Sequence, residues 1–166
     1  GLLFIKANIE IAPLISGGSQ EFNKRSGTQS TAHRVAFAKI IRKSFEQMDK
    51  NYKHVTYLNK ILRDNLENIN TSRESTPYIL NLSVPPLKPE TVLHALVKHG
   101  IYISTKSACS SKNNKISRVL EAMNLSDDLG MSAIRVSLSS HTTEKEIHEF
   151  IEKFKQVIKE LKEVVK

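Results

Sequence analysis

The feature that most constrains the fold is the segment 132–138, in which apolar side chains alternate with small or polar ones. One side of the extended chain carries Ile134, Val136 and Leu138, and the other side carries Arg135 at its centre. This alternation predicts a strand with one buried face. A similar alternation over residues 78–84 predicts a second strand, which Pro85-Pro86 would end.

Between and around these strands, apolar residues recur at the three- and four-residue spacing of helices. The predicted helices cover approximately 36–48, 55–69, 90–99, 116–123 and 144–165. The first two form either separate helices or one long bent helix, and we expect both apolar stripes to lie in the core. A short strand is expected at 101–103 and a turn at 124–130. The spacing of Thr143 and Glu146 predicts a capping box at the start of the last helix. The pattern predicts an α+β fold with a small, mostly antiparallel sheet covered by helices.

The composition, net charge and cysteine count limit the classes of function that the chain can have. The 166 residues include 39% hydrophobic and 25% charged residues, which favours a folded core. The net charge of +8 admits an RNA-binding module, but the lysines are dispersed, so no direct nucleic-acid partner is expected. The single cysteine excludes an internal disulfide, and neither His33 nor His54 has a second ligand at metal-binding spacing. We therefore expect no metal site, and we expect His33 and His54 to be solvated or hydrogen-bonded.

The chain shows neither a membrane-spanning apolar run nor a signal peptide, so a cytoplasmic location with a reduced thiol is expected. It has no initiator Met and begins with the strand-like apolar run Gly1–Ile5. The sequence therefore reads as a segment cut out of a longer protein.

Four residues at three places in the chain are candidates for chemistry. Cys109 lies among small and polar residues in a predicted loop, where exposure and nearby lysines favour a reactive thiolate. Arg25 and Thr28 precede a helix, whose N-terminus suits a phosphate or carboxylate. Arg135 projects from the middle of a strand, with room for a bidentate carboxylate. A salt bridge from Arg135 to a helix glutamate is an equally open interpretation.

Four motifs in register carry a family likeness: Gly17-Gly18-x-Gln20-Glu21-x-x-x-Arg25-x-Gly27-Thr28, Ser107-Ala108-Cys109-Ser110-Ser111, Ile134-Arg135-Val136-Ser137-Leu138 and Thr142-Thr143-Glu144-x-Glu146-Ile147. The sequence resembles the C-terminal portion of cysteine desulfurases of the NifS/IscS type. These are pyridoxal-phosphate enzymes of the class V aminotransferase group, which have the fold of type I pyridoxal-phosphate enzymes. The resemblance spans nearly the whole chain.

The resemblance implies a role for each matching residue. Cys109 matches the nucleophile that takes the sulfur of L-cysteine as a persulfide, leaving L-alanine. Arg135 matches the arginine that binds the substrate carboxylate. Thr28 matches a threonine that reaches the cofactor phosphate of the other subunit of a homodimer. A sulfur-acceptor protein would then be a cluster scaffold or a tRNA-thiolation enzyme.

The resemblance also implies a domain organisation. Residues 1–28 would be a remnant strand and loop of the large cofactor-binding domain, and residues 29–166 the small C-terminal domain. The lysine that holds pyridoxal phosphate matches a position before Gly1, so the chain alone is expected to be inactive and not to bind the cofactor. Two alternatives stay open: a basic, non-enzymatic module for RNA or another polyanion, and a related selenocysteine lyase or aminotransferase.

Overall fold

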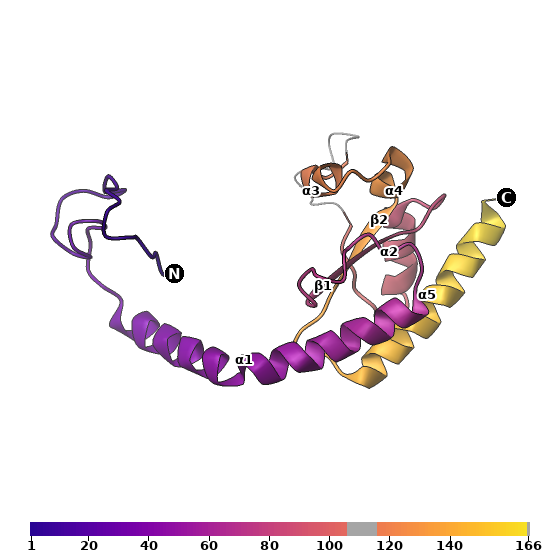
Figure 1. Cartoon of the computed structure of the whole chain (residues 1–166), viewed down its shortest axis with the longest axis horizontal. Coiled ribbons are helices and arrows are strands. Elements are labelled where there is room, and N and C mark those ends of the chain that lie inside the picture. Colours follow the sequence, from indigo (N-terminus) through magenta and orange to yellow (C-terminus); the bar gives the residue numbers. More distant parts are fainter. Residues whose placement is uncertain (106–115, 166) are drawn as a thin grey trace. The chain divides into compact units, whose positions relative to one another are not determined.

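The computed structural model describes residues 1–105 and 116–165. Its elements are α1 (Thr31–Asn65), β1 (Ile79–Ser83), α2 (Pro89–Val97), α3 (Arg118–Ala122), α4 (Asp127–Met131), β2 (Ala133–Ser137) and α5 (Glu144–Val164) (Figure 1). The strands form a two-stranded antiparallel sheet, which confirms the predicted α+β class. The chain divides into two compact units, Gly1–Met48 and Asp49–Lys166. The predicted domain boundary after residue 28 concerns a longer enzyme and stays a prediction.

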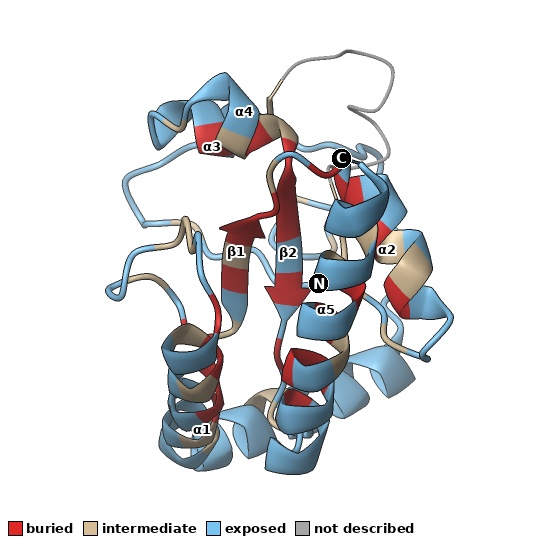
Figure 2. Cartoon of the chain, turned by 90° about the vertical axis from the view of Figure 1, so that its right-hand side faces the viewer, coloured by how far each residue is buried: buried red, intermediate tan, exposed pale blue. Residues whose placement is uncertain are grey.

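The sheet of the second unit has one buried face, as the alternation predicts. Leu80 pairs with Val136 and Leu82 pairs with Ile134, and all four side chains are buried. Helices cover this face, and Figure 2 shows the buried positions on the strands and on the inner sides of the helices. The largest fully buried side chains are Leu58, Leu62, Leu80, Leu82, Leu96, Ile134, Val55, Val92 and Val157.

Local signals fix the ends of two helices. Thr143 and Glu146 form the predicted capping box at the start of α5, with the Thr143 N–H donating to Glu146 Oε2 at 2.7 Å. Pro89 occupies the first turn of α2, where its missing N–H costs nothing. Gly100 follows that helix with a φ of 73°, a backbone conformation that favours glycine.

A single residue pairs with the outer side of each strand. Ile69 forms an antiparallel bridge with Leu82 of β1, and Ser104 forms one with Arg135 of β2. The strand expected at 101–103 is therefore reduced to one bridge at Ser104. This bridge has two hydrogen bonds, of 3.0 Å from Ser104 N to Arg135 O and 2.7 Å from Arg135 N to Ser104 O.

Helix α1 is continuous through the polar residues 49–51, so the single-helix alternative is correct. Its C-terminal half buries Val55, Leu58 and Leu62, as predicted. The expectation that the N-terminal stripe lies in the core is wrong for this chain, because Ile40 is 59% and Phe45 is 68% exposed. No segment of the first unit covers this stripe among the described residues.

Further expectations need correction. Residues 1–5 form no strand, and Leu2, Leu3 and Phe4 are exposed, because an extended segment is stable only when another strand pairs with it. The region 124–130, expected to be a turn, contains most of α4. In the short helix α3, Leu120 is buried but Val119 is exposed. Across 1–105 and 116–165, no helix combines the length and apolar character needed to cross a membrane.

Candidate functional site

Arg135 lies at the centre of β2 on the face opposite the core. Its neighbours in sequence, Ile134 and Val136, are buried, whereas Arg135 and Ser137 are exposed. The alternation of the strand therefore directs the guanidinium away from the apolar layer, as the sequence predicts.

Small and polar side chains surround Arg135 on this face. Asn81 of β1 is its register partner, and Ser104 pairs with it from the other side. Because the backbone groups of Arg135 bond to Ser104, Arg135 and Asn81 form a non-hydrogen-bonded pair, in which facing side chains lie closest. Ala133 and Ser137 are the neighbours two positions away on β2. These short side chains leave space around the guanidinium.

The guanidinium of Arg135 forms no ion pair and no hydrogen bond with any residue in 1–105 or 116–165. The alternative interpretation, a salt bridge to a helix glutamate, is therefore absent from the described part of the chain. An arginine without a carboxylate partner keeps its planar set of donors available for an anionic ligand.

A row of polar side chains continues along the same face of β1. Asn81 Nδ2 donates to the Ile134 carbonyl at 2.9 Å, and Asn70 Nδ2 donates to Asn81 Oδ1 at 2.7 Å. Asn70 Nδ2 also lies 2.8 Å from Ser83 Oγ, which donates to the Leu129 carbonyl at 2.7 Å. These bonds tie β1 to β2 and hold the asparagine side chains in place.

The first unit contains a second polar site, built on an ordered loop. Ser26 Oγ accepts from Gly18 N and donates to Gly18 O, each at 2.7 Å, and Ser26 N donates to the Ile15 carbonyl at 3.1 Å. Gly27 has a φ of 114°, and a Cβ there would lie 2.8 Å from Arg25 Nη1. The paired-glycine motif therefore forms an ordered loop.

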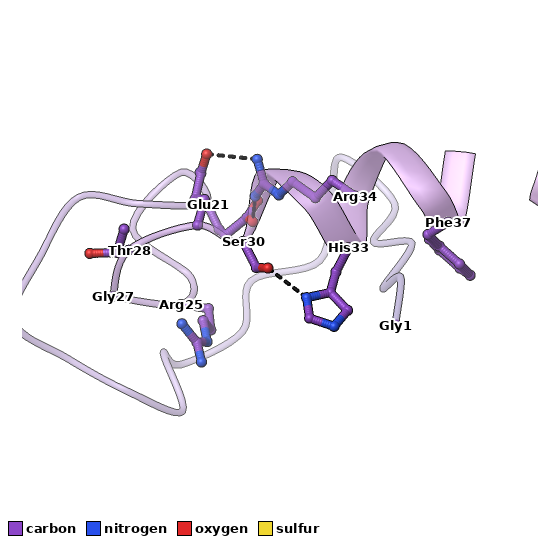
Figure 3. Close-up of a pocket in the computed structure, with 10 residues that line it drawn as sticks. Gly1, Glu21, Arg25, Gly27, Thr28, Ser30, His33, Arg34 and Phe37 are labelled. Atoms are coloured by element: carbon purple, nitrogen blue, oxygen red, sulfur yellow. Dashed lines mark hydrogen bonds and ion pairs between the residues drawn. The ribbon is translucent and has the colours of Figure 1, made fainter. Parts of the chain in front are cut away.

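This loop and the first turn of α1 line a pocket of about 300 Å³ (Figure 3). Thr28 lies on the loop that leads into α1, and Ser30 Oγ lies 2.6 Å from His33 Nδ1. Arg34 forms an ion pair with Glu21. The lining consists of Gly1, Glu21, Arg25, Gly27, Thr28, Gln29, Ser30, His33, Arg34 and Phe37.

The chemistry of this pocket suits a phosphate group. It combines Arg25 with the hydroxyls of Thr28 and Ser30, next to the N-terminus of a 35-residue helix that has no acidic residue in its first turn. Backbone N–H groups and the helix dipole at such an end favour an anion. Glu21 is the single carboxylate of the lining and is already paired with Arg34.

The histidines behave as the sequence predicts. His33 is hydrogen-bonded to Ser30, and His54 Nε2 lies 2.8 Å from the Thr142 carbonyl. Within 1–105 and 116–165, no group of three or more His, Cys, Asp or Glu side chains is arranged to hold a metal ion.

The three predicted site residues fall in different parts of the chain. Thr28 belongs to the first unit and Arg135 to the second. Cys109 lies outside the described residues. Its proposed role rests on the sequence motif.

The sequence reasoning missed Asn81 and Ser104, the two residues that the structure places beside Arg135. One signal was available for Asn81, because asparagine is depleted in strands and here occupies the middle of one. No comparable signal existed for Ser104, because its position depends on a single long-range bridge.

Comparisons with known proteins agree with the motifs. The family model for class-V aminotransferases matches residues 12–150. A protein named cysteine desulfurase IscS from Dictyoglomus turgidum is 32% identical over 171 residues, covering 99% of this chain and 43% of that protein. The protein of the same name from Mannheimia succiniciproducens is 34% identical over 172 residues, covering 99% of this chain and 42% of that protein.

Solved structures show the same relationship. A NifS-like protein matches with a TM-score of 0.82 and 32% identity, over 94% of this chain and 41% of that one. The NifS-like protein from Rickettsia africae matches with a TM-score of 0.74 and 26% identity, over 90% of this chain and 41% of that one. The chain thus spans less than half the length of these relatives. With most of its residues covered by the family model, the chain belongs to the class-V aminotransferase family.

Proposed function

We propose that this chain is the C-terminal part of a pyridoxal-phosphate-dependent cysteine desulfurase, which converts L-cysteine to L-alanine and carries the sulfur on Cys109. The observation that carries the proposal is the pairing of Ser104 with Arg135. This pairing holds Ser104 next to Arg135, whose guanidinium has no partner among the described residues. From Ser104 the chain continues in sequence towards Cys109. The names of the relatives support the choice of substrate.

In this proposal the guanidinium of Arg135 binds the carboxylate of L-cysteine through two parallel N–H···O bonds. The small neighbours Ala133 and Ser137 leave room for the ligand. Binding at the carboxylate orients the substrate so that its sulfur is presented in one defined direction.

The sulfur step belongs to Cys109. Its thiolate attacks the sulfur of the substrate, so that a sulfur–sulfur bond forms while the carbon–sulfur bond breaks. The electron pair of the broken bond stays on the substrate carbon, which is protonated to give L-alanine. Pyridoxal phosphate, when bound in the complete enzyme, supplies the electron sink for this chemistry. The persulfide on Cys109 is then passed to a sulfur acceptor.

The pocket of the first unit would hold the cofactor phosphate. The hydroxyl groups of Thr28 and Ser30 would donate hydrogen bonds to the phosphate, and Arg25 would supply a positive charge. The N-terminus of α1 would add backbone N–H donors. We propose that this phosphate belongs to the cofactor of the other subunit in a homodimer. The acceptor would be a cluster scaffold or a tRNA-thiolation enzyme, and the complete enzyme would act in the cytoplasm.

Two substitutions in the complete enzyme test the proposal. Cys109→Ala should abolish sulfide release from L-cysteine, because no thiolate remains to take the sulfur. Arg135→Lys should raise the KM for L-cysteine by about tenfold, because a lysine cannot form the bidentate pair. Lys98→Arg, an exchange of one cation for another away from both sites, is the control. Full activity of Cys109→Ala would refute the assignment of the nucleophile.

The chain by itself should be inactive. With pyridoxal phosphate and L-cysteine added, it should form no L-alanine, because the cofactor-holding lysine matches a position before Gly1. Alanine is measured by chromatography against the Cys109→Ala chain. Alanine formation above that background would contradict the expectation.

A further inference from the structure

The asparagines beside Arg135 have a fixed orientation, which follows from the chain of hydrogen bonds on that face. The Leu129 carbonyl can only accept, so Ser83 Oγ must donate to it and has its lone pairs left for Asn70 Nδ2. Asn70 therefore presents its NH₂ group, which also donates to Asn81 Oδ1. The direction of each bond sets the direction of the next.

The hydrogen bond from Asn81 to the Ile134 carbonyl, at the other end of this series of bonds, requires the same orientation of the Asn81 amide. The Ile134 carbonyl also can only accept, and Asn81 Nδ2 donates to it at 2.9 Å. A flipped Asn81 amide would place two oxygens against each other at Ile134 and two NH₂ groups against each other at Asn70. Both ends thus hold the oxygen of Asn81 against Asn70 and its NH₂ group towards β2.

This orientation has a consequence for Arg135, the register partner of Asn81. The amide oxygen of Asn81, which would otherwise compete for the guanidinium, is turned towards Asn70. The NH₂ group of Asn81 uses one N–H on Ile134, and its second N–H has no partner in 1–105 or 116–165. Asn81 therefore presents only a donor on the side of Arg135.

We propose that Asn81 is a second binding residue for the substrate carboxylate, and that Asn70 is the positioning residue that keeps the Asn81 amide in its donor orientation. The inference rests on the proposed function for the identity of the ligand, an α-amino acid bound through its carboxylate. Arg135 supplies the charge, and the free N–H of Asn81 supplies a further hydrogen bond to a carboxylate oxygen.

The first test needs no cofactor and uses the chain itself. The Nε–Hε signal of Arg135, assigned with Arg135→Lys, is followed by nuclear magnetic resonance while acetate replaces chloride at constant ionic strength. The unmodified chain should give a saturable shift. Asn81→Ala should weaken acetate binding by about tenfold, the effect of losing a hydrogen bond to a charged group.

Asn81→Asp separates a binding role from a structural one. The new carboxylate has nearly the same shape but lies beside Arg135, so it should pair with the guanidinium. The Nε–Hε signal should then be displaced before any acetate is added, and acetate should have no further effect. Asn65→Asp makes the same exchange on α1 and should leave the titration unchanged.

Asn70→Ala tests the positioning role. It removes one of the two hydrogen bonds that hold the Asn81 amide, so the amide can turn its oxygen towards Arg135 part of the time. Acetate binding should therefore be weakened while the other amide signals of β2 keep their positions. Asn70→Ala also decides the question if Asn81→Asp fails to fold. Unchanged acetate binding in Asn81→Ala, or in Asn70→Ala, would overturn the corresponding assignment.

The complete enzyme provides a separate readout. Asn81→Asp should raise the KM for L-cysteine by about tenfold or more, whereas inhibition by cysteamine, which lacks the carboxylate, should not weaken. Equal losses for both compounds would indicate a structural role and refute the proposal. If the enzyme is not a desulfurase, the acetate titration still reports whether Arg135 and Asn81 bind a carboxylate. A failure of the proposed function can therefore be told apart from a failure of the proposal for Asn81.

Discussion

Individual side chains fix the start of α5 through three hydrogen bonds between Thr143 and Glu146. Thr143 Oγ1 accepts from the backbone N–H of Glu146, and the Glu146 carboxylate accepts from the backbone N–H and the hydroxyl of Thr143. The backbone and side-chain hydrogen bonds from Thr143 lower the pKa of Glu146, with a small opposing effect of burial. The cap therefore depends on an ionised carboxylate.

Removal of this cap should destabilise the chain in a pH-dependent way. Thr143→Ala should lower the free energy of unfolding by about 1 kcal/mol near neutral pH. Because the pKa of Glu146 is lower in the folded state, its contribution is present above its unfolded pKa and is lost as the pH falls through its folded pKa.

Urea unfolding of both proteins at neutral pH and near pH 3 measures the difference. The gap between Thr143→Ala and the unmodified chain should be smaller in acid. Glu160→Gln, a neutralised glutamate on the same helix, should show no such cap-dependent change. A gap that grows in acid would contradict the role of the ionised carboxylate.

Among the elements, α1 differs most between its two halves. Leu58 has no exposed surface, whereas Phe45, on the same helix, is 68% exposed. Both are large apolar residues, Phe45 from the stripe predicted over 36–48 and Leu58 from the one predicted over 55–69. The periodicity of a helix thus identifies its apolar side, but not whether another segment packs against that side.

Paired alanine substitutions should show this difference. Leu58→Ala should lower the free energy of unfolding by about 2–5 kcal/mol, because it leaves a cavity in the core. Phe45→Ala should change it by about 0.5 kcal/mol or less, because the side chain has few contacts to lose. Urea denaturation followed by circular dichroism measures both. A comparable loss for Phe45→Ala would mean that its stripe is covered in solution.

The elements also show what the sequence allows one to predict. The strands β1 and β2 and the cap of α5 follow from short-range patterns, and all were predicted at nearly their observed bounds. The bridge of Ser104 to Arg135 joins residues 31 positions apart in a segment without alternation, so no local pattern could reveal it. Arg135 could be named as a candidate site residue, whereas its neighbour Ser104 could not.

On the scale of the whole chain, the buried residues concentrate in the second unit. Residues 31–40 of α1 are all exposed, whereas the core of Asp49–Lys166 includes side chains from α1, β1, α2, β2 and α5. Local opening is easiest where few buried contacts hold the backbone. The two halves of one helix should therefore open with different free energies.

Hydrogen exchange followed by mass spectrometry tests this expectation. Backbone amides of residues 31–48 should exchange faster than those of 55–65, although both segments are helical. Leu58→Ala should accelerate exchange in 55–65 and leave 31–48 nearly unchanged. Equal protection along the whole helix would contradict the division into two units.

The residues that pair with the outer sides of the sheet have a consequence for self-association. A strand whose outer N–H and C=O groups are free can recruit a strand from another molecule, which leads to aggregation. Here Asn70 N donates to the outward carbonyl of Asn81, and Ser104 engages both outward groups of Arg135. The middle of each strand is thus closed to intermolecular pairing, which protects a sheet of only two strands from growing into a fibril.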